Sequence, residues 1–446
     1  MSKIEQEFKD VTFDDNAFVA LLEKLISESK YLQNDPGQGL IPQECKSAAH
    51  VEEYLKPYIG EGGPLKFEKL EYEKGRPNVK ITYQGSDSKE TIGIIGCHLD
   101  VVPANPEKWE VDPFKLTIKG DKLYGRGTTD CLGHVAMVTM LMASLAKNKP
   151  KLKRTVVALF IASEEGGGPG VGVDMVVKHG KIKELHNGPV FWVDSADSQP
   201  CCGTAGSIRW HLKFTGRIFH SGLPHKGINA LELGMEALKV LQDKFYKAFP
   251  AHELEKKYKF MCPSTMKPTQ MECAKGSLNQ IPRQCVISGD VRLTPFYDIK
   301  ELYDKMESWV KDLNDNIEKL PTRGPMSKYV LEGDDVDIKR GVIELEWGAS
   351  LKDCRHMEGI ACDLSSVGFK ALCDATAAVK GKAAPYSITG SLPLVREMQK
   401  EGFDLQITGF GLSKTYHADN EYVLLSDMRD AFKVLSLLIQ KCEDSV

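Results

Sequence analysis

Histidine and carboxylate residues able to bind metal ions follow several apolar stretches of this chain. His98 and Asp100 come directly after the apolar run at residues 91–97. Residues two positions apart on an extended strand share a face, so the Asp100 carboxylate can fix the tautomer of His98 while the other ring nitrogen binds a metal. Taken alone, such a His-x-Asp string also has a purely structural interpretation.

Two adjacent glutamates, Glu164 and Glu165, follow a second apolar run at residues 155–162. Adjacent carboxylates repel each other unless a cation or a shared proton compensates. Because neighbours on a strand point in opposite directions, one glutamate can bind a metal while the other faces a water molecule. An exposed acidic turn is the alternative. The glycine-rich stretch at 166–170 matches neither the Walker A pattern nor G-x-G-x-x-G, which excludes a phosphate loop.

Further candidate metal ligands lie next to predicted strands or helices or near the end of the chain. Asp130 precedes a helical pattern and could be only its N-cap. Asp194 ends a third apolar run, with Asp197 three residues later, and His417 lies near the end of the chain. Each has an ordinary structural explanation, as a cap, a loop aspartate or a buried histidine. Together, two imidazoles and at least three carboxylates at the ends of core strands suit a pair of divalent cations.

The elements that must position these residues are those of an α/β domain with an insertion. Apolar runs separated by a helical pattern at 131–147 predict a mainly parallel sheet, which presents its ligands at the C-terminal strand ends. From about residue 209 the order strand, helix, two strands, helix, strand predicts an α+β domain of the ferredoxin-like type. Its strands are expected at 209–214, 276–282, 284–293 and 342–347, and its helices at 230–249 and 299–317. We therefore predict a catalytic di-metal domain at 1–208 and 356–446, and an inserted lid or dimerisation domain at 209–355.

Length and composition exclude several classes of protein. The 446 residues exceed what one core usually serves, and 42% hydrophobic and 27% charged residues are globular values. A net charge of -4 gives no positive field for nucleic acid or an anionic membrane. No apolar stretch approaches the roughly 18 to 20 residues of a membrane span, and the start shows no signal or transit peptide. We expect a soluble, cytoplasmic protein without nucleic-acid or membrane partners.

The combination of motifs resembles the M20 family of metallopeptidases and amidohydrolases. The His-x-Asp string, Gly-Arg-Gly-Thr-Thr-Asp at 125–130, the glutamate pair, an acidic residue after a later strand and the late histidine follow that family's order. The resemblance covers nearly the whole chain, and the strings at 125–134, 263–270 and 288–298 are most similar to members that hydrolyse N-acetylornithine. One departure is Cys-Leu-Gly at 131–133, where many relatives have Met-Lys-Gly; it removes a lysine and leaves the expected ligands intact.

The resemblance implies a role for each candidate. Two divalent cations, zinc or cobalt, would share one bridging carboxylate, and each would take one histidine and one further carboxylate. The implied ligands are Asp130 as the bridge, His98 and Asp194 for one cation, and Glu165 and His417 for the other. Glu164 would be the general base and Asp100 the partner of His98. Many relatives have a glutamate at the position of Asp194, which keeps Asp197 as an alternative; we prefer Asp194 because it directly ends the strand.

The resemblance also implies functional residues in and near the lid. His220, within Phe-His-Ser-Gly-Leu-Pro-His, matches a histidine that reaches the partner's active site in dimeric relatives and stabilises the tetrahedral intermediate. Asn279 and Arg292 match positions that hold the substrate carboxylate. Gly390 and Ser391 belong to a Gly-Ser-Leu-Pro loop whose amides could bind a carboxylate or an oxyanion.

The expected activity is metal-assisted hydrolysis of the amide of a small N-acyl amino acid. N-acetylornithine is the expected substrate, cleaved to ornithine and acetate in arginine biosynthesis by a homodimer. A dipeptidase or aminoacylase of the same family is the first alternative, because the metal ligands cannot separate these activities. A catalytically silent binding protein with the same fold is the second.

Overall fold

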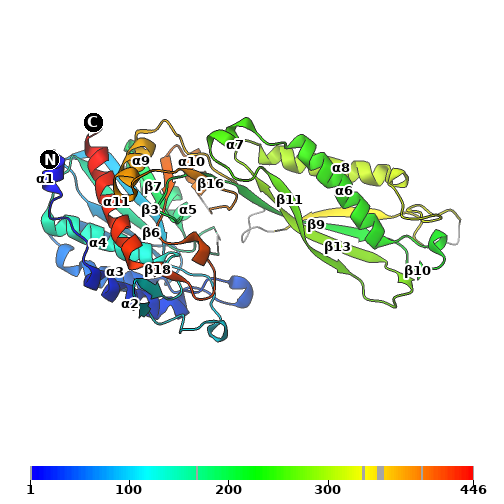
Figure 1. Cartoon of the computed structure of the whole chain (residues 1–446), viewed down its shortest axis with the longest axis horizontal. Coiled ribbons are helices and arrows are strands. Elements are labelled where there is room, and N and C mark those ends of the chain that lie inside the picture. Colours follow the sequence, from blue (N-terminus) through cyan, green and yellow to red (C-terminus); the bar gives the residue numbers. More distant parts are fainter. Residues whose placement is uncertain (1–2, 167–168, 334–336, 349–355, 393–394, 445–446) are drawn as a thin grey trace. The chain divides into compact units, whose positions relative to one another are not determined.

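A computed structural model describes residues 3–166, 169–333, 337–348, 356–392 and 395–444 (Figure 1). The chain forms two compact units. The first comprises Met1–Gly203, Ala361–Ser387 and Pro393–Val446, and the second comprises Thr204–Ile360 and Ile388–Leu392. The second unit thus includes the short segment with Gly390 and Ser391, which the sequence analysis assigned to the first domain. Residues 349–355, where the predicted lid ends, lie outside the described residues.

The first unit is built on a largely parallel sheet, which confirms the predicted fold class. The strand order is β1-β2-β6-β3-β7-β17-β8-β16, and neighbours among β6, β3, β7 and β17 are parallel. All eight residues of β6 are buried, as expected of a central strand covered on both faces. The strands are β1 (Leu65–Glu71), β2 (Pro77–Tyr83), β3 (Asp87–His98), β6 (Arg154–Ile161), β7 (Pro189–Val193), β8 (Cys201–Thr204), β16 (Tyr386–Ile388) and β17 (Asp404–Thr408).

Several helices pack on this sheet. Helix α4 (Leu132–Asn148) packs against β2, β3 and β6, and α9 (Val367–Lys380) packs against β7 and β17. Their buried residues share one hydrophobic core with α2 (Asp15–Leu32), α3 (Cys45–Leu55) and α11 (Leu425–Asp444). Helix α4 is apolar nearly all round, which is typical of a helix enclosed by neighbours on every side.

A small antiparallel sheet joins two distant parts of the first unit. Strand β18 (Tyr422–Leu424) pairs with β5 (Lys122–Tyr124), which pairs with β4 (Thr117–Lys119). This pairing brings the segment that follows His417 next to the segment that precedes Asp130. The other elements of the unit are α1 (Lys3–Glu7), α5 (Val173–Lys178), α10 (Val395–Lys400), and the 3-10 helices η1 (Pro36–Gln38), η2 (Lys56–Tyr58), η3 (Pro106–Lys108), η4 (Lys183–Asn187) and η7 (Ser413–Thr415).

The second unit is an α+β sandwich, and the strand order of its sheet is β11-β13-β9-β14. Helices α6 and α8 pack on the sheet, and residues of both helices and the sheet form a separate core around Trp210. The elements are β9 (Gly206–Thr215), β10 (Phe219–His220), η5 (Pro224–Lys226), α6 (Ala230–Ala248), α7 (Glu253–Lys257), β11 (Thr265–Cys273), β12 (Gln280–Ile281), β13 (Gln284–Leu293), α8 (Ile299–Asp315), η6 (Ile317–Lys319), β14 (Val342–Trp347) and β15 (His356–Met357).

One predicted strand of the second unit was wrong. The strand expected at 276–282 is mostly loop, with only Gln280–Ile281 paired, and Thr265–Cys273 supplies the sheet strand instead. This segment contains Pro268 and is mostly exposed, so it lacks the apolar alternation that identifies a strand. Proline is tolerated there because β11 lies at the edge of the sheet.

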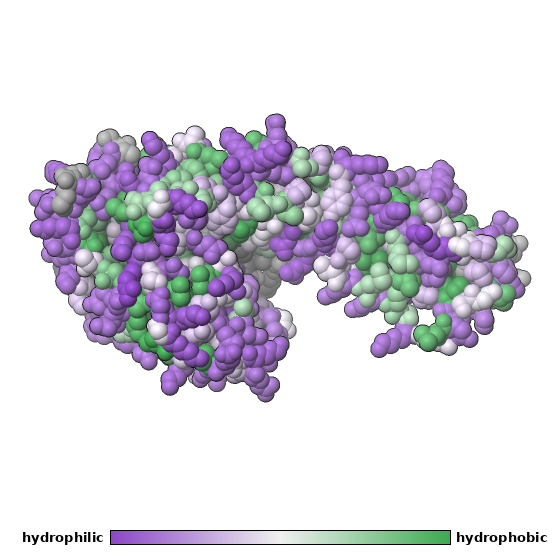
Figure 2. Space-filling model, in the orientation of Figure 1, coloured by the Kyte–Doolittle hydropathy of each residue, from purple (hydrophilic) through white to green (hydrophobic). Residues whose placement is uncertain are grey.

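Hydrophilic residues cover most of the visible surface of each unit (Figure 2). Among the described residues, none of the helices is both long and apolar enough to cross a lipid bilayer.

Candidate metal centre

The C-terminal ends of the parallel strands bring the predicted ligands together. His98 is the last residue of β3, Asp194 follows β7 directly, and Glu164 and Glu165 follow β6 after a two-residue connection. Asp130 lies just before α4, and its backbone is joined to Cys131 by a cis peptide bond. The cap position of α4 is Cys131, so Asp130 is not the N-cap of this helix.

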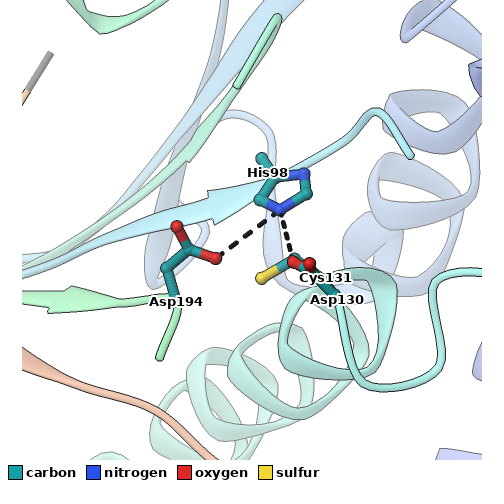
Figure 3. A group of neighbouring side chains, drawn as sticks. All are labelled: His98, Asp130, Cys131 and Asp194. Carbon is teal, nitrogen blue, oxygen red and sulfur yellow. Dashed lines mark hydrogen bonds and ion pairs between the residues drawn. The ribbon is translucent and has the colours of Figure 1, made fainter. Parts of the chain in front are cut away.

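The first group of predicted ligands surrounds His98, which is completely buried. His98 Nε2 lies 2.9 Å from Asp130 Oδ1 and 3.5 Å from Asp194 Oδ1 (Figure 3). The other Asp194 oxygen, Oδ2, accepts a 3.4 Å hydrogen bond from the indole of Trp192, which leaves Oδ1 directed at the histidine. The Cys131 thiol lies within 4.8 Å of these ligand atoms.

The second group shares Asp130 with the first. His417 Nε2 lies 3.1 Å from Asp130 Oδ2 and 3.1 Å from Glu165 Oε2. The two oxygens of Asp130 therefore face two different histidines, which is the arrangement required of a carboxylate that bridges two metals. Within the described residues, Glu165 Oε1 is buried without a hydrogen-bond partner. The donor set and this unsatisfied oxygen both fit a pair of divalent cations.

The electrostatics of the group also favour cations. Burial raises the pKa of Glu164 well above its ordinary value, and the charge of Asp194 adds to the shift. Burial and the Asp130 charge raise the pKa of Glu165 to about 7. Hydrogen bonds to Asp130 and Glu165 raise the pKa of His417 to about 11. These shifts show several carboxylates crowded round few positive groups, a charge excess that bound cations neutralise.

Asp100 does more than hold His98. His98 Nδ1 lies 2.9 Å from the backbone oxygen of Asp100 and 3.3 Å from its Oδ1. The same carboxylate accepts hydrogen bonds from the backbone amides of Glu164 at 3.1 Å and Glu165 at 3.0 Å. Asp100 thus fixes the histidine and the glutamate pair relative to each other.

Asp194 and Asp197 differ clearly in the structure. Asp194 is buried in the ligand group, whereas Asp197 is exposed and its Oδ1 accepts a 3.1 Å hydrogen bond from the Ser413 amide. Asp197 also has a φ of 67°, in the left-handed region. The geometry therefore favours Asp194 as the ligand.

Glu421 is a site residue that the sequence analysis missed. Its carboxylate is fully buried and accepts a 2.7 Å hydrogen bond from Arg126 Nη1. It also accepts hydrogen bonds from the backbone amides of Gly127, Thr129 and Asp130, at 3.1, 2.8 and 3.0 Å. The only sequence signal was its position four residues after His417, which also suits a solvated loop glutamate.

The predicted lid residues lie in the second unit, and their roles stay predictions. His220 is exposed, and its Nδ1 accepts a 3.0 Å hydrogen bond from the Gly222 amide. The backbone oxygen of Asn279 accepts the Ser221 amide at 2.9 Å, so these two segments lie side by side. Arg292 Nε donates to Asp290 Oδ2 at 2.7 Å.

The remaining predicted residues, Gly390 and Ser391, lie in the short segment that the second unit takes from the end of the chain. The backbone oxygen of Gly390 accepts a 3.0 Å hydrogen bond from the Ala205 amide.

The fold and the group of predicted ligands are those of a metal-dependent hydrolase, and comparison with known proteins agrees. Residues 94–441 match the model of peptidase family M20/M25/M40, and the chain belongs to this family of metal-dependent hydrolases. The chain is 53% identical over 435 residues to acetylornithine deacetylase of Arabidopsis thaliana, covering 97% of each chain. It is 48% identical over 442 residues to acetylornithine deacetylase of Dictyostelium discoideum, covering 96% of this chain and 97% of that one.

Solved structures support the same fold. Human carnosine dipeptidase 1 has a TM-score of 0.66 at 17% identity, covering 100% of this chain and 99% of the other. A dinuclear metal-binding M20 peptidase of Bacillus subtilis has a TM-score of 0.62 at 14% identity, covering 97% and 100%. The predicted family, fold class and hydrolase class are thereby confirmed.

Proposed function

We propose that the protein cleaves N-acetylornithine to ornithine and acetate, a step of arginine biosynthesis, as a di-metal amidohydrolase. The observation that carries the proposal is the Asp130 carboxylate, whose two oxygens face His98 and His417 beside the carboxylate of Glu164. The similarity to two acetylornithine deacetylases over nearly the whole of each chain supports the substrate.

Two divalent cations, zinc or cobalt, are the proposed cofactors. Asp130 would bridge them, with His98 and Asp194 holding one and Glu165 and His417 holding the other. Imidazole and carboxylate ligands accept both metals, so the donor set does not choose between them. When bound, such cations polarise an acyl carbonyl as Lewis acids and lower the pKa of water.

Glu164 is the proposed general base. Its carboxylate is buried, and Oε2 lies 4.0 Å from His98 Nε2. Burial raises the pKa of Glu164, and a carboxylate of raised pKa is a stronger base toward water and can return the proton to the leaving amine. Asp100 holds the Glu164 backbone through its amide, which limits the movement of the base.

The lid residues would act on the substrate. We propose that His220 stabilises the oxyanion and that Asn279 and Arg292 bind the substrate carboxylate, for which a planar guanidinium offers two parallel hydrogen bonds. The amides of Gly390 and Ser391 would bind a carboxylate or the oxyanion.

Replacement of Glu164 by glutamine tests the general base. Glu164→Gln keeps the size of the side chain but cannot accept the proton, so kcat should fall at least about 100-fold. Metal content, measured by elemental analysis, should stay at two ions per chain. Glu90→Gln is the control, because Glu90 lies at the opposite end of β3, where it pairs with Arg154. Normal turnover by Glu164→Gln would contradict the assignment.

A substrate panel tests the reaction against its alternatives. We expect the highest kcat/KM for N-acetylornithine, compared with N-acetylmethionine and a simple dipeptide. A preference for N-acetylmethionine would indicate an aminoacylase, and a preference for the dipeptide would indicate a dipeptidase. A protein with fewer than two bound metals and no hydrolysis of any of the three would be a binding protein.

We also propose a cytoplasmic homodimer in which His220 serves the partner's site. His220→Ala and Glu164→Gln should each be inactive alone, but mixed dimers would contain one site with an intact Glu164 and the partner's intact His220. Mixing the two variants after mild dissociation should therefore restore activity, and light scattering should give the mass of a dimer. A fully active monomer would contradict this arrangement.

A further inference from the structure

Four consecutive backbone amides follow strand β6, and each donates a hydrogen bond to a side-chain oxygen. The last two belong to Glu164 and Glu165, and the first two belong to the connection that precedes them. The pairs are Ala162 with Asn78 Oδ1 at 3.0 Å, Ser163 with Glu44 Oε1 at 3.2 Å, Glu164 with Asp100 Oδ1 at 3.1 Å, and Glu165 with Asp100 Oδ2 at 3.0 Å. The path of the backbone through both glutamates is therefore set by three side chains.

Asn78 and Glu44 lie before residue 94, where the family match begins. Asn34, which contacts the third acceptor, Asp100, also lies in this part of the chain. Asn34 donates from Nδ2 to Asp100 Oδ2 at 2.7 Å, on the same oxygen that binds the Glu165 amide. Its own amide donates to the Val101 oxygen at 2.9 Å, so Asn34 is held against the residue that follows Asp100. Asn34 is 5% exposed.

Asn34 also packs directly on the backbone that follows the glutamate pair. A Cβ at Gly166 would lie 2.5 Å from Asn34 Oδ1, so only glycine allows this approach without a shift. The loop of Glu164 and Glu165 is thus enclosed by Asn34 on one side and by Asp100 on the other.

Glu44 supports the Ser163 amide as part of a buried ion pair. Arg76 donates from Nη2 to Glu44 Oε1 at 2.7 Å and from Nε to Oε2 at 3.0 Å, and both side chains are buried. Ser163 has a φ of 61°, in the left-handed region that residues with a Cβ adopt at some cost. The bond from its amide to an acceptor that Arg76 holds in place helps to keep this conformation.

We propose that Asn34, Glu44 and Asn78 are positioning residues that set the backbone of Glu164 and Glu165, so that the N-terminal part of the chain completes the active site. Asn34 acts mainly through Asp100, its shorter contact, and only weakly through a 3.5 Å contact from Nδ2 to Ser163 Oγ. Glu44 and Asn78 accept hydrogen bonds directly from the connection after β6. This inference rests on the proposed function for the role of Glu164. A displacement of about 1 Å at a catalytic group can cost about 100-fold in rate, and loss of a partner that orients a metal ligand typically costs 10- to 100-fold.

The test is a titration of the metal-free, full-length protein with zinc ions, followed by steady-state kinetics. Asn34→Ala should weaken binding of the second zinc equivalent and lower kcat, each by about 10- to 100-fold, with KM nearly unchanged. Asn148→Ala is the matched control, because Asn148 donates to the Asp10 and Ser144 backbone oxygens, away from the ligands. The control should lose neither zinc affinity nor kcat.

A double-mutant cycle separates positioning from a general loss of stability. If Asn34 acts through Asp100, Asn34→Ala should cause little further loss of zinc affinity in an Asp100→Ala background, whereas Glu44→Gln should still weaken it. Additive effects of Asn34→Ala and Asp100→Ala would overturn the inference. So would an Asn34→Ala protein that melts at a lower temperature but binds zinc and turns over normally. The zinc titration needs no substrate, so its outcome is independent of whether N-acetylornithine is cleaved.

Discussion

Replacing Glu421 by glutamine tests whether a buried ion pair holds the backbone of Asp130, the proposed bridging ligand. Glu421 is fully buried and Arg126 is 1% exposed, and their 2.7 Å contact joins segments 295 residues apart. Burial raises the pKa of Glu421, while Arg126 and the amide donors oppose this shift. We expect the ionised form at neutral pH, because the four groups that the structure places at its oxygens are all donors.

The expected cost follows from the geometry. Oε2 accepts from Arg126 and the Gly127 amide, and Oε1 accepts from the Thr129 and Asp130 amides. A glutamine keeps one acceptor oxygen and turns an NH2 group toward the other two donors, so two donors lose their acceptor. Removing one partner of a buried ion pair costs about 3–5 kcal/mol. We expect Glu421→Gln to lower the free energy of unfolding of the first unit by that amount.

Urea unfolding of chelator-treated protein, followed by circular dichroism, measures this loss without the stabilisation that bound metal would add. The matched control is Glu443→Gln. Glu443 also accepts two backbone amides, those of Lys153 and Arg154, but it is only partly buried. The control should lose about 1 kcal/mol, as is usual for ordinary hydrogen bonds. An equally small loss for Glu421→Gln would refute the reasoning that a buried charge pair organises this loop.

Three shorter predictions concern the ligands and their support. Asp194→Asn should lose about one bound metal per chain, whereas Asp197→Asn should retain both; elemental analysis that finds the reverse would exchange their roles. Because hydrogen bonds to two carboxylates raise the pKa of His417 to about 11, metal binding at pH 7 should release a proton from it. Calorimetric titrations in buffers of different ionisation enthalpy would detect this release, and identical heats would contradict it. Gly133→Ala should cost about 1–3 kcal/mol and lower the melting temperature, because the new Cβ would lie 2.1 Å from the Thr128 oxygen; unchanged melting would show that the turn relaxes freely.

The C-terminal ends of the buried strands could be predicted because their signal is local. An apolar run that stops at a polar residue marks a buried parallel strand and its C-terminal end within a few positions, as at His98 and Asp194. The helix predicted at 131–147 is α4, shifted by one residue at each end. Where the local signal is weak, prediction failed: Thr265–Cys273 is an exposed edge strand whose polar residues and proline resemble a loop.

The supporting residues could not be predicted, because their roles depend on contacts between distant segments. Asn34 contacts Asp100 across 66 residues, and Glu44 contacts Ser163 across 119. Nothing near them in the sequence distinguishes a buried carboxylate or amide from a solvated one. The pairing of β18 with β5, which brings Glu421 to the Asp130 loop, is likewise a property of the folded chain and not of either segment.

The supports of the site are independent of the metals that it is proposed to bind. Asp100 accepts hydrogen bonds from the backbone amides of Glu164 and Glu165, and Glu421 accepts one from the amide of Asp130. These bonds hold the backbone of the three residues and leave their carboxylate oxygens free of this task. Crowded carboxylates repel one another in the absence of cations, and a loop held only through its ligands would open to relieve that repulsion. Because the backbone is held separately, the repulsion is retained in a fixed geometry and is relieved when cations bind. A site prepared in this way loses little free energy to reorganisation, both when metal binds and when charge develops during hydrolysis.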